Sequence, residues 1–360
     1  YNLFKDFKQI IPQGSIMAQL GVDSIGSLSN CFVVGQPVDS YGGIFQKDQQ
    51  LAQLMKRRGG AGIDIATLRP AGVATSNAAK SSTGAMSFMN RFSNTTREVA
   101  QNGRRGALMI STDINHPDVL DFIKAKRDLT QITGANISIK LNDDFMNAVV
   151  NDEDYVLRFP CDADISGLIY PHDAIEQGLQ EVEDYYIKVI RAKEYWNEII
   201  KSAHSVAEPG LMFLNAMVDY SPDGIYEQFR QITTNPCSEI ILRPYQFCNL
   251  TEVVVRAEDT IEDLERKIGL ATILGTIQST LTDLKYLRKI WKDNTEEERL
   301  LGVSLTGLYE YHIYLAEGLN LFGGAGISIG GGKNLFILNA DVIGGLEYTF
   351  YNFPLNISID

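Results

Sequence analysis

Short apolar segments alternate with amphipathic ones over the first 150 residues of the chain. Brief apolar runs of the kind found in buried strands occur at 31–34 and 107–110, and residues 136–139 alternate between polar and apolar as a strand does. Between them, apolar residues recur with helical spacing, which predicts helices over 44–58, 86–101, 115–126 and 143–150. Because strands that alternate with helices usually form parallel sheets, this pattern favours an α/β architecture.

The remainder of the chain contains longer elements. We expect a long helix over 173–205, a helix that begins at 221–223, strands at 239–242 and 252–255, and helical structure over 258–290. Two glycine-containing segments interrupt the pattern: Gly59-Gly60-Ala61-Gly62 is expected to form a turn, and residues 70–84 a loop. From Gly318 the chain differs, with Gly-Gly pairs, many aromatic residues and few charges.

Composition and charge are those of an ordinary globular protein. Of 360 residues, 44% are hydrophobic and 21% charged, and the formal net charge is -13. Such an acidic chain is a poor match for nucleic acid, and its apolar runs fall short of the roughly 20 residues that cross a bilayer. The first residues lack the features of a signal peptide, so we expect a cytoplasmic protein. Basic groups around Lys56, Arg104 and Lys124 indicate either small anionic ligands such as nucleotides or solvated surfaces.

The four cysteines could form a metal site, pack as buried thiols or act in redox chemistry. Cys31, Cys161, Cys237 and Cys248 lack the CxxC pairs of a structural zinc site, and the histidines have no ligand spacing, so no metal site is expected. In a reducing compartment, thiols are either small buried hydrophobic groups or redox-active groups. Their number alone favours the first interpretation.

Asn235-Pro236-Cys237-Ser238-Glu239 is the sharpest local motif. Pro236 disfavours a helix at Asn235 and removes a backbone donor, so we expect an extended segment. Because alternate residues of an extended chain point the same way, Asn235, Cys237 and Glu239 would face one cavity. An amide, a thiol and a carboxylate would then reach one small ligand. The plainer alternative is a turn before a strand.

A series of motifs in the same order resembles the catalytic subunit of ribonucleotide reductases, up to about residue 310. The matching segments are SNCFV (29–33), GGAGIDIATLRPAG (59–72), SSTGAMSFM (81–89), QNGRRGALM (101–109), HPD (116–118), TGANIS (133–138), NPCSE (235–239), PYQFCNL (244–250) and GVSLTGL (302–308). The family usually has Q-G-G where this chain has Gln101-Asn102-Gly103, and asparagine tolerates the positive φ of such a turn. The resemblance implies a partial ten-stranded α/β barrel with a central finger loop.

The resemblance further implies a thiyl-radical reaction that reduces ribonucleotides to 2'-deoxyribonucleotides, with diphosphates favoured by family frequency. Cys237 would become the thiyl radical that takes the 3'-hydrogen, and Glu239 would accept the 3'-OH proton. Cys31 would protonate the departing 2'-hydroxyl. Cys31 and Cys248 would supply two electrons by forming a disulfide, which requires Cα atoms within about 7 Å of each other.

Substrate contacts complete the implied active site. Asn235 would hold the substrate hydroxyls, and Ser29 and Asn30 would contact the nucleotide. The three thiols would meet in one enclosed pocket. Cys161 has no family role and is expected to be a structural or surface thiol, while His116 is expected to cap or pack rather than catalyse.

A nucleoside triphosphate effector, ATP or a dNTP, is also implied, with its loops within residues 39–109. Asp39 and Ser40 would contact the effector base, and Arg69 its phosphates. A second loop would lie between effector and substrate base, and its contact residues would be Gln101, Arg104 and Arg105. Arginine in a glycine-flanked loop suits phosphate or base contacts.

The resemblance assigns residues 1–317 to the barrel and leaves 318–360 unmatched, so we expect a chain that lacks the family's C-terminal part. The radical source is either adenosylcobalamin or a metal-containing partner subunit. Expected partners are a thioredoxin-like or glutaredoxin-like reductant, a second copy in a homodimer, and a radical-generating subunit or C-terminal half. Two alternatives remain: a glycyl-radical or other thiol-dependent enzyme with the same barrel, and a split or truncated nucleotide-binding half that is inactive without a partner chain. A partial barrel would expose apolar surface and tend to associate.

Overall fold

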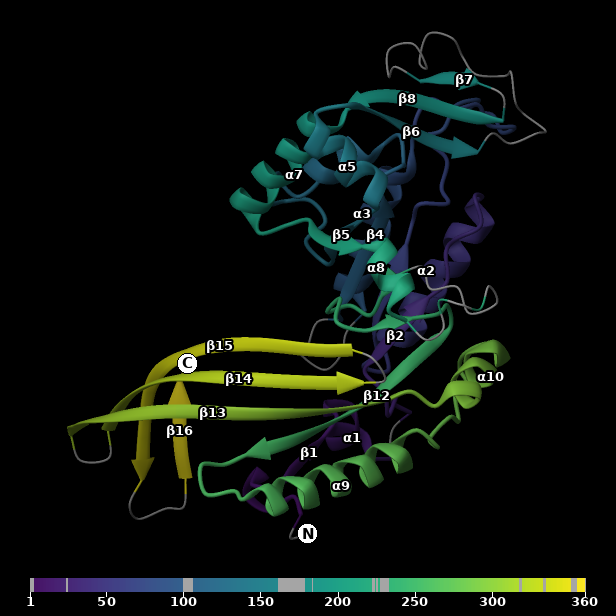
Figure 1. Cartoon of the computed structure of the whole chain (residues 1–360). Helices are drawn as coiled ribbons and strands as arrows, with labels where there is room; N and C mark the ends of the chain where they lie inside the picture. Colours follow the sequence, from purple (N-terminus) through teal and green to yellow (C-terminus); the bar gives the residue numbers. More distant parts are fainter. Residues whose placement is uncertain are drawn as a thin grey trace. The chain divides into compact units, whose positions relative to one another are not determined.

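The computed structural model describes residues 3–23, 25–99, 106–160, 179–182, 184–221, 224, 226, 233–316, 319–332, 335–350 and 355–359 (Figure 1). The chain divides into two compact units. The barrel unit comprises Gly21–Phe247 and Asp283–Thr295, and the terminal unit comprises Tyr1–Leu20, Cys248–Thr282 and Glu296–Asp360.

The described part of the barrel unit contains a sheet of parallel strands. In sheet order these are β2 (Cys31–Val34), β3 (Gly60–Asp64), β4 (Leu108–Asp113), β5 (Asn136–Leu141) and β9 (Gly210–Phe213). Helices lie between them in the chain: α2 (Tyr41–Met55), the 3-10 helix η2 (Ala85–Phe88), α3 (Met89–Glu98), α4 (Val119–Lys124), α5 (Asp143–Asn151) and α7 (Ala192–Val206). Strands whose sheet order follows their chain order through intervening helices are the arrangement of an α/β barrel. The predicted partial α/β barrel is confirmed.

The two faces of this sheet differ in chemistry because side chains alternate along each strand. One face belongs to the main hydrophobic core and packs against the helices; it carries Phe32, Val34, Ala61, Ile63, Leu108, Ile110, Ile137, Ile139 and Leu141. The intervening residues form the opposite face, which we call the inner face; they include Cys31, Gly60, Gly62, Asp64, Ser111 and Lys140. The inner face therefore presents a thiol, hydroxyls and charges that the apolar core excludes.

Strand β3 replaces the turn predicted at residues 59–62. Gly60 and Gly62 lie within the strand and point to the inner face, where other backbone approaches closely. A Cβ on Gly62 would lie 1.8 Å from the carbonyl oxygen of Thr234. The glycines are thus needed for a close approach between backbones and not for chain reversal.

Three predicted helices have different bounds in the structure. Residues 185–191 form β8 (Tyr185–Arg191), which pairs antiparallel with β6 (Asp154–Pro160) and β7 (Gln180–Val182), so only α7 is helical in the described part of 173–205. Tyr186 and Ile190 of β8 are buried while their neighbours are more exposed, a strand pattern that the acidic surroundings obscured. Helix α4 begins at Val119, after an N-cap at Asp118, and residues 258–290 divide into α9 (Ile261–Gln278) and the start of α10 (Lys289–Glu298).

The terminal unit is mostly β-structure around α9. It contains the 3-10 helix η1 (Lys5–Phe7), β1 (Ile10–Pro12), α1 (Gly14–Gln19) and most of β12 (Gln246–Val255). β12 pairs antiparallel with β1 and parallel with β13 (Leu301–Ala316). β14 (Leu319–Gly332), β15 (Leu335–Phe350) and β16 (Leu355–Ile359) continue the sheet as antiparallel strands.

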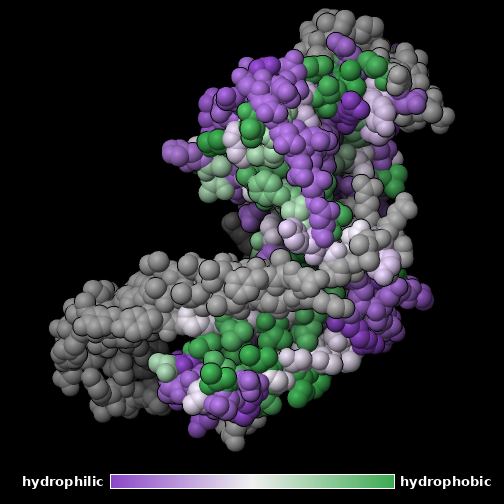
Figure 2. Space-filling view, viewed as in Figure 1, coloured by the Kyte–Doolittle hydropathy of each residue, from purple (hydrophilic) through white to green (hydrophobic). Residues whose placement is uncertain are grey.

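Figure 2 shows hydrophobic residues gathered over the α9 side of the terminal unit. Ile261, Ile273 and Ile277 of α9 have exposed side chains. Over the described residues, every helix is too short or too polar to span a lipid bilayer.

Candidate active site

The Asn235–Glu239 motif forms the tip of a hairpin. Strands β10 (Thr233–Thr234) and β11 (Ile241–Leu242) pair antiparallel, and the backbone N–H of Asn235 donates to the carbonyl oxygen of Ile240. The N–H of Ser238 donates to the carbonyl oxygen of Asn235 over 3.1 Å, and Ser238 has a φ of 68°. The expectation of an extended segment was therefore wrong, and the alternative of a turn is correct.

This turn brings the ends of the motif together. The Asn235 side-chain amide donates to Oε1 of Glu239 over 2.6 Å, and its carbonyl oxygen accepts from the backbone N–H of Ile240. The second carboxylate oxygen of Glu239, Oε2, is buried and has no hydrogen-bond partner among the described residues. The arrangement holds the carboxylate by one oxygen and leaves the other able to accept a proton.

Cys237 lies at the tip of the hairpin and is exposed, so the described residues do not enclose it as the expected pocket required. Its sulfur is nevertheless partly desolvated. The pKa of the thiol is raised to about 11, first by this desolvation, then by the Glu239 carboxylate and by Cys31. At neutral pH the group is therefore a protonated thiol and not a thiolate.

Cys31 lies close to the hairpin. It is the first residue of β2, is buried, and pairs in register with Gly60 of β3. A Cβ on Gly60 would lie 3.0 Å from Cγ of Pro236, so the hairpin rests on the strand beside Cys31. Because Cys31 lies this close to the hairpin, its charge contributes to the raised pKa of the Cys237 thiol. Two of the three predicted reactive thiols thus occupy one region of the inner face.

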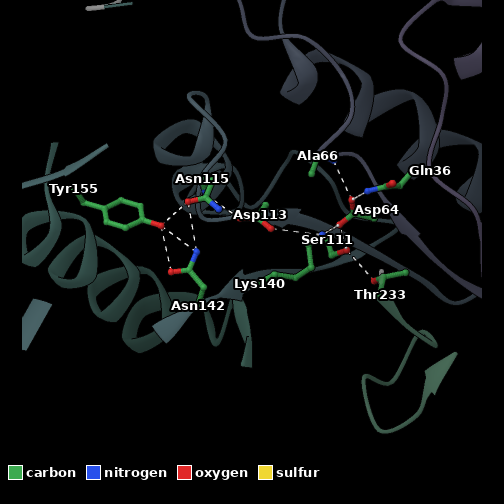
Figure 3. A network of polar contacts seen from close by, with 10 residues as sticks. All are labelled: Gln36, Asp64, Ala66, Ser111, Asp113, Asn115, Lys140, Asn142, Tyr155 and Thr233. Carbon is green, nitrogen blue, oxygen red and sulfur yellow. Dashed lines mark hydrogen bonds and ion pairs between the residues drawn. The ribbon is translucent and has the colours of Figure 1, made fainter. Parts of the chain in front are cut away.

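Polar contacts anchor the base of the hairpin to the sheet (Figure 3). The hydroxyl groups of Thr233 and Ser111 lie 2.8 Å apart, and Ser111 donates to Oδ2 of Asp64 over 2.8 Å. Lys140 forms an ion pair with the same carboxylate oxygen at 2.9 Å. Asp64 and Lys140 are almost fully buried, and their pairing offsets much of the cost of burying each charge. Sequence reasoning missed this group; the alternation of Gly60, Gly62 and Asp64 along one strand was the available signal.

Of the remaining predicted active-site residues, Ser29 and Asn30 directly precede Cys31, whereas Cys248 belongs to the terminal unit. Cys248 is buried in β12, and its carbonyl oxygen accepts from the Gln13 side chain at 3.5 Å within the terminal unit. Its pairing with Cys31 stays a prediction. Ser29 is buried just before β2, and its backbone N–H donates to the hydroxyl oxygen of Ser27 over 3.0 Å. The carbonyl oxygen of Asn30 accepts from the N–H of Gly60.

The predicted effector residues after β2 and β3 bond to one another. Arg69 pairs with Asp39, Nε to Oδ2, at 2.7 Å, and its backbone N–H donates to Oδ1 of the same carboxylate. Ser40 caps the N-terminus of α2 by accepting from the N–H of Gly43. The other predicted effector residues, Gln101, Arg104 and Arg105, lie outside the described residues, as does Cys161.

His116 and Asp118 organise the loop that precedes η2. The ring of His116 is buried, with Nε2 2.8 Å from the carbonyl oxygen of Leu68 and Nδ1 accepting from the N–H of Asp118. The carboxylate of Asp118 accepts from the N–H groups of Ala71 and Ala85. Burial raises the pKa of this carboxyl group, and His116 opposes the rise. The expectation that His116 has a packing role is confirmed. The described residues contain no group of His, Cys, Asp and Glu that could hold a metal ion.

Comparison with known sequences shows the family to which this chain belongs. The family described as "Ribonucleotide reductase, barrel domain" matches residues 29–318, so the chain belongs to the ribonucleotide reductase family. Its relatives include proteins of two kinds. It is 33% identical to a vitamin B12-dependent ribonucleoside-diphosphate reductase of Thermoplasma acidophilum, over 68% of this chain and 29% of that protein.

Further relatives bear the same two kinds of name. A vitamin B12-dependent ribonucleoside-diphosphate reductase of Mycobacterium tuberculosis is 30% identical over 68% of this chain and 32% of its own length. A ribonucleoside-diphosphate reductase large subunit of Danio rerio is 24% identical over 80% of this chain and 38% of its own. The chain therefore spans about a third of the length of the curated relatives it matches.

Proposed function

We propose that this chain carries the thiyl-radical centre of a ribonucleoside-diphosphate reductase. The observation that carries the proposal is the hairpin tip, where the thiol of Cys237 is held protonated beside the half-bonded carboxylate of Glu239. A nucleophilic cysteine needs a lowered pKa, because its thiolate is the reactive form. The raised pKa keeps Cys237 as an S–H group, which is the form that a hydrogen-atom donor requires.

The proposed reaction begins with removal of a hydrogen atom from the Cys237 thiol. The resulting thiyl radical takes the hydrogen from C3' of the ribose, so the S–H bond forms again as the C–H bond breaks. Oε2 of Glu239 accepts the proton of the 3'-hydroxyl, and the Asn235 amide keeps the carboxylate in place through Oε1. Loss of the 2'-hydroxyl as water follows, with its proton supplied by Cys31.

The reduction step requires two electrons and a second thiol. Cys31 and Cys248 supply the electrons by forming a disulfide, and the hydrogen of the Cys248 thiol goes to C2'. The proton held by Glu239 returns to the 3'-oxygen, and Cys237 finally returns a hydrogen atom to C3'. An external dithiol protein of the thioredoxin or glutaredoxin type then reduces the disulfide. The position of Cys31 beside the hairpin supports its role as the proton donor.

The radical itself comes from adenosylcobalamin or from a metal-containing partner subunit. Relatives named vitamin B12-dependent reductases and relatives named large subunits both match this chain, and both sources deliver the same change, abstraction of one hydrogen atom from a thiol. The described residues carry no feature that assigns either source. Ser29 and Asn30 are proposed to contact the substrate, because they precede Cys31 directly.

Effector binding is proposed at the loops that follow β2 and β3. The Asp39–Arg69 ion pair closes the two loops against each other, and Ser40 begins α2 beside it. A nucleoside triphosphate would exchange the carboxylate for phosphate at Arg69, since the guanidinium binds either anion by the same fork of donors. Gln101, Arg104 and Arg105 complete the proposed site. A homodimer is the proposed assembly.

Exposure of Cys237 favours a second candidate function, a nucleotide-binding part that is inactive alone. Radical chemistry requires a site closed to water, and the relatives are about three times longer than the matched segment. We propose that further polypeptide covers the hairpin in the active enzyme.

CDP reduction distinguishes these functions. The 360-residue chain is assayed for dCDP with a dithiol reductant, with adenosylcobalamin added or omitted, alone and with a polypeptide that supplies the rest of a relative's barrel. Cys237→Ala is expected to abolish product, and Cys161→Ala, the matched control, to retain it. Turnover by the Cys237→Ala variant would refute the radical assignment. Nucleotide binding with turnover only in the complemented mixture identifies the second candidate.

A further inference from the structure

Asp64 is a buried carboxylate whose two oxygens serve different parts of the barrel unit (Figure 3). It ends β3 and points to the inner face beneath the hairpin. Neither the family motifs nor the proposed reaction assigns it a role.

Oδ1 of Asp64 binds the two segments that lead into the proposed effector loops. The side-chain amide of Gln36 donates to this oxygen over 2.6 Å, and the backbone N–H of Ala66 donates over 3.2 Å. Gln36 lies three residues before Asp39, and Ala66 three residues before Arg69. The effector ion pair is therefore linked by a short stretch of chain on each side to one oxygen atom.

Oδ2 of Asp64 binds the support of the catalytic hairpin. Ser111 donates to this oxygen, so the single hydroxyl proton of Ser111 is committed and Thr233 is the donor in the contact between the two hydroxyl groups. Thr233 begins the hairpin, two residues before Asn235. Lys140 neutralises the carboxylate from β5 and lies 3.9 Å from Asp113.

We infer that Asp64 is a positioning residue that couples the proposed effector loops to the catalytic hairpin. This inference rests on the proposed function for its biological meaning. Motion of the loop after β2 moves Gln36 and hence Asp64, and Asp64 moves Ser111 and the base of the hairpin. A carboxylate suits this position because its two oxygens accept from Gln36, Ala66 and Ser111 and pair with Lys140, so that one buried side chain contacts both regions.

The test measures the position of the hairpin through the alkylation rate of Cys237 by iodoacetamide in the full chain. Cysteine-containing peptides are quantified by mass spectrometry, with Cys248 as the internal reporter of general unfolding. Gln36→Ala removes the effector-side contact, Ser111→Ala removes the hairpin-side contact, and both are combined. Thr112→Val is the matched control, because this buried hydroxyl lies on the neighbouring residue of β4 and has no hydrogen-bond partner among the described residues.

Each single variant is expected to raise the Cys237 rate about fivefold, the factor that corresponds to one hydrogen bond of ordinary strength. The double variant is expected to show less than the product of the two factors, because both contacts act through Asp64. Ser111→Thr, which keeps the hydroxyl, is expected to restore the wild-type rate. Thr112→Val should leave the rate unchanged.

Three results would overturn the inference: an unchanged Cys237 rate in Gln36→Ala, strictly multiplicative effects in the double variant, or a parallel rise for Cys248. The measurement needs neither nucleotide nor radical. The alkylation rates can therefore support the role of Asp64 in a chain without reductase activity, and they can contradict it in an active reductase. The inference and the proposed function are thus tested separately.

Discussion

The side-chain amide of Asn235 donates to one oxygen of the Glu239 carboxylate over 2.6 Å and leaves the other oxygen buried without a partner among the described residues. Three residues separate the two in the chain, and the turn at Pro236–Ser238 makes the contact possible. The amide therefore both closes the hairpin and orients the proposed general base.

Loss of this contact should destabilise the hairpin. Asn235→Ala removes the bond to Glu239 and the bond from Ile240, and it leaves buried groups unpaired. We expect the free energy of unfolding to fall by about 1–3 kcal/mol, the usual cost of an unsatisfied buried polar group. Urea denaturation measures it, with Asn215→Ala as control because Asn215 makes one exposed hydrogen bond. Equal midpoints for the two variants would contradict the role of Asn235.

Neutralising Glu239 should make Cys237 more acidic. Desolvation is the main cause of the raised thiol pKa, and the negative charge of Glu239 is the next. Because a nearby negative charge disfavours the thiolate, Glu239→Gln should lower the pKa from about 11. The pH profile of Cys237 alkylation should shift to lower pH, with faster reaction at pH 8 to 9 in the variant. Glu258→Gln, an exposed change in the terminal unit, should leave the pH profile unchanged. A Glu239→Gln profile that is not shifted would show that the charge of Glu239 does not raise the pKa of Cys237.

A methyl group at Gly62 should displace the hairpin. Its Cβ would lie 1.8 Å from Thr234 O, and backbone on both sides prevents relief by a side-chain rotation. We expect Gly62→Ala to lower the melting temperature and to abolish reductase activity. Gly269→Ala in α9 is the contrasting control, since a Cβ there meets nothing within 4 Å and alanine favours a helix by roughly 0.5–1 kcal/mol. A Gly62→Ala protein as stable as the wild type would show that the hairpin does not rest on β3.

Asp118 should make stability depend on pH in the acid range. Burial raises the pKa of its carboxyl group above 3.8, so the folded protein binds the proton more readily than the unfolded chain. The resulting stabilisation is present below pH 3.8 and is lost as pH rises through the folded pKa. Asp118→Asn is neutral throughout, so the stability of the wild type relative to this variant should decline over that range. Urea midpoints measured at a series of pH values test this, and a difference independent of pH would contradict it.

Local sequence was sufficient for elements with a clear pattern of apolar residues. β2 was predicted from its apolar run and β5 from its alternation, whereas α2 and α5 were predicted from helical spacing because each buries one stripe against the core. β8 and β3 were not found. The apolar residues of β8 follow an acidic segment at 181–184. In β3 the decisive residues are glycines, which are needed because of a hairpin more than 170 positions away.

The sequence by itself determined the family, because motifs such as SNCFV and NPCSE keep their order along the chain, and it supplied the residues that we propose as the site. Only the tertiary structure decided that Asn235–Glu239 is a closed turn, that Asp39 meets Arg69, and that Asp64 joins two regions. These contacts need a backbone direction or a partner that no local pattern encodes: Ser111 and Thr233, for example, are 122 residues apart. The sequence specifies which functional groups are present, whereas the distances between them are set only when the strands pair in the sheet.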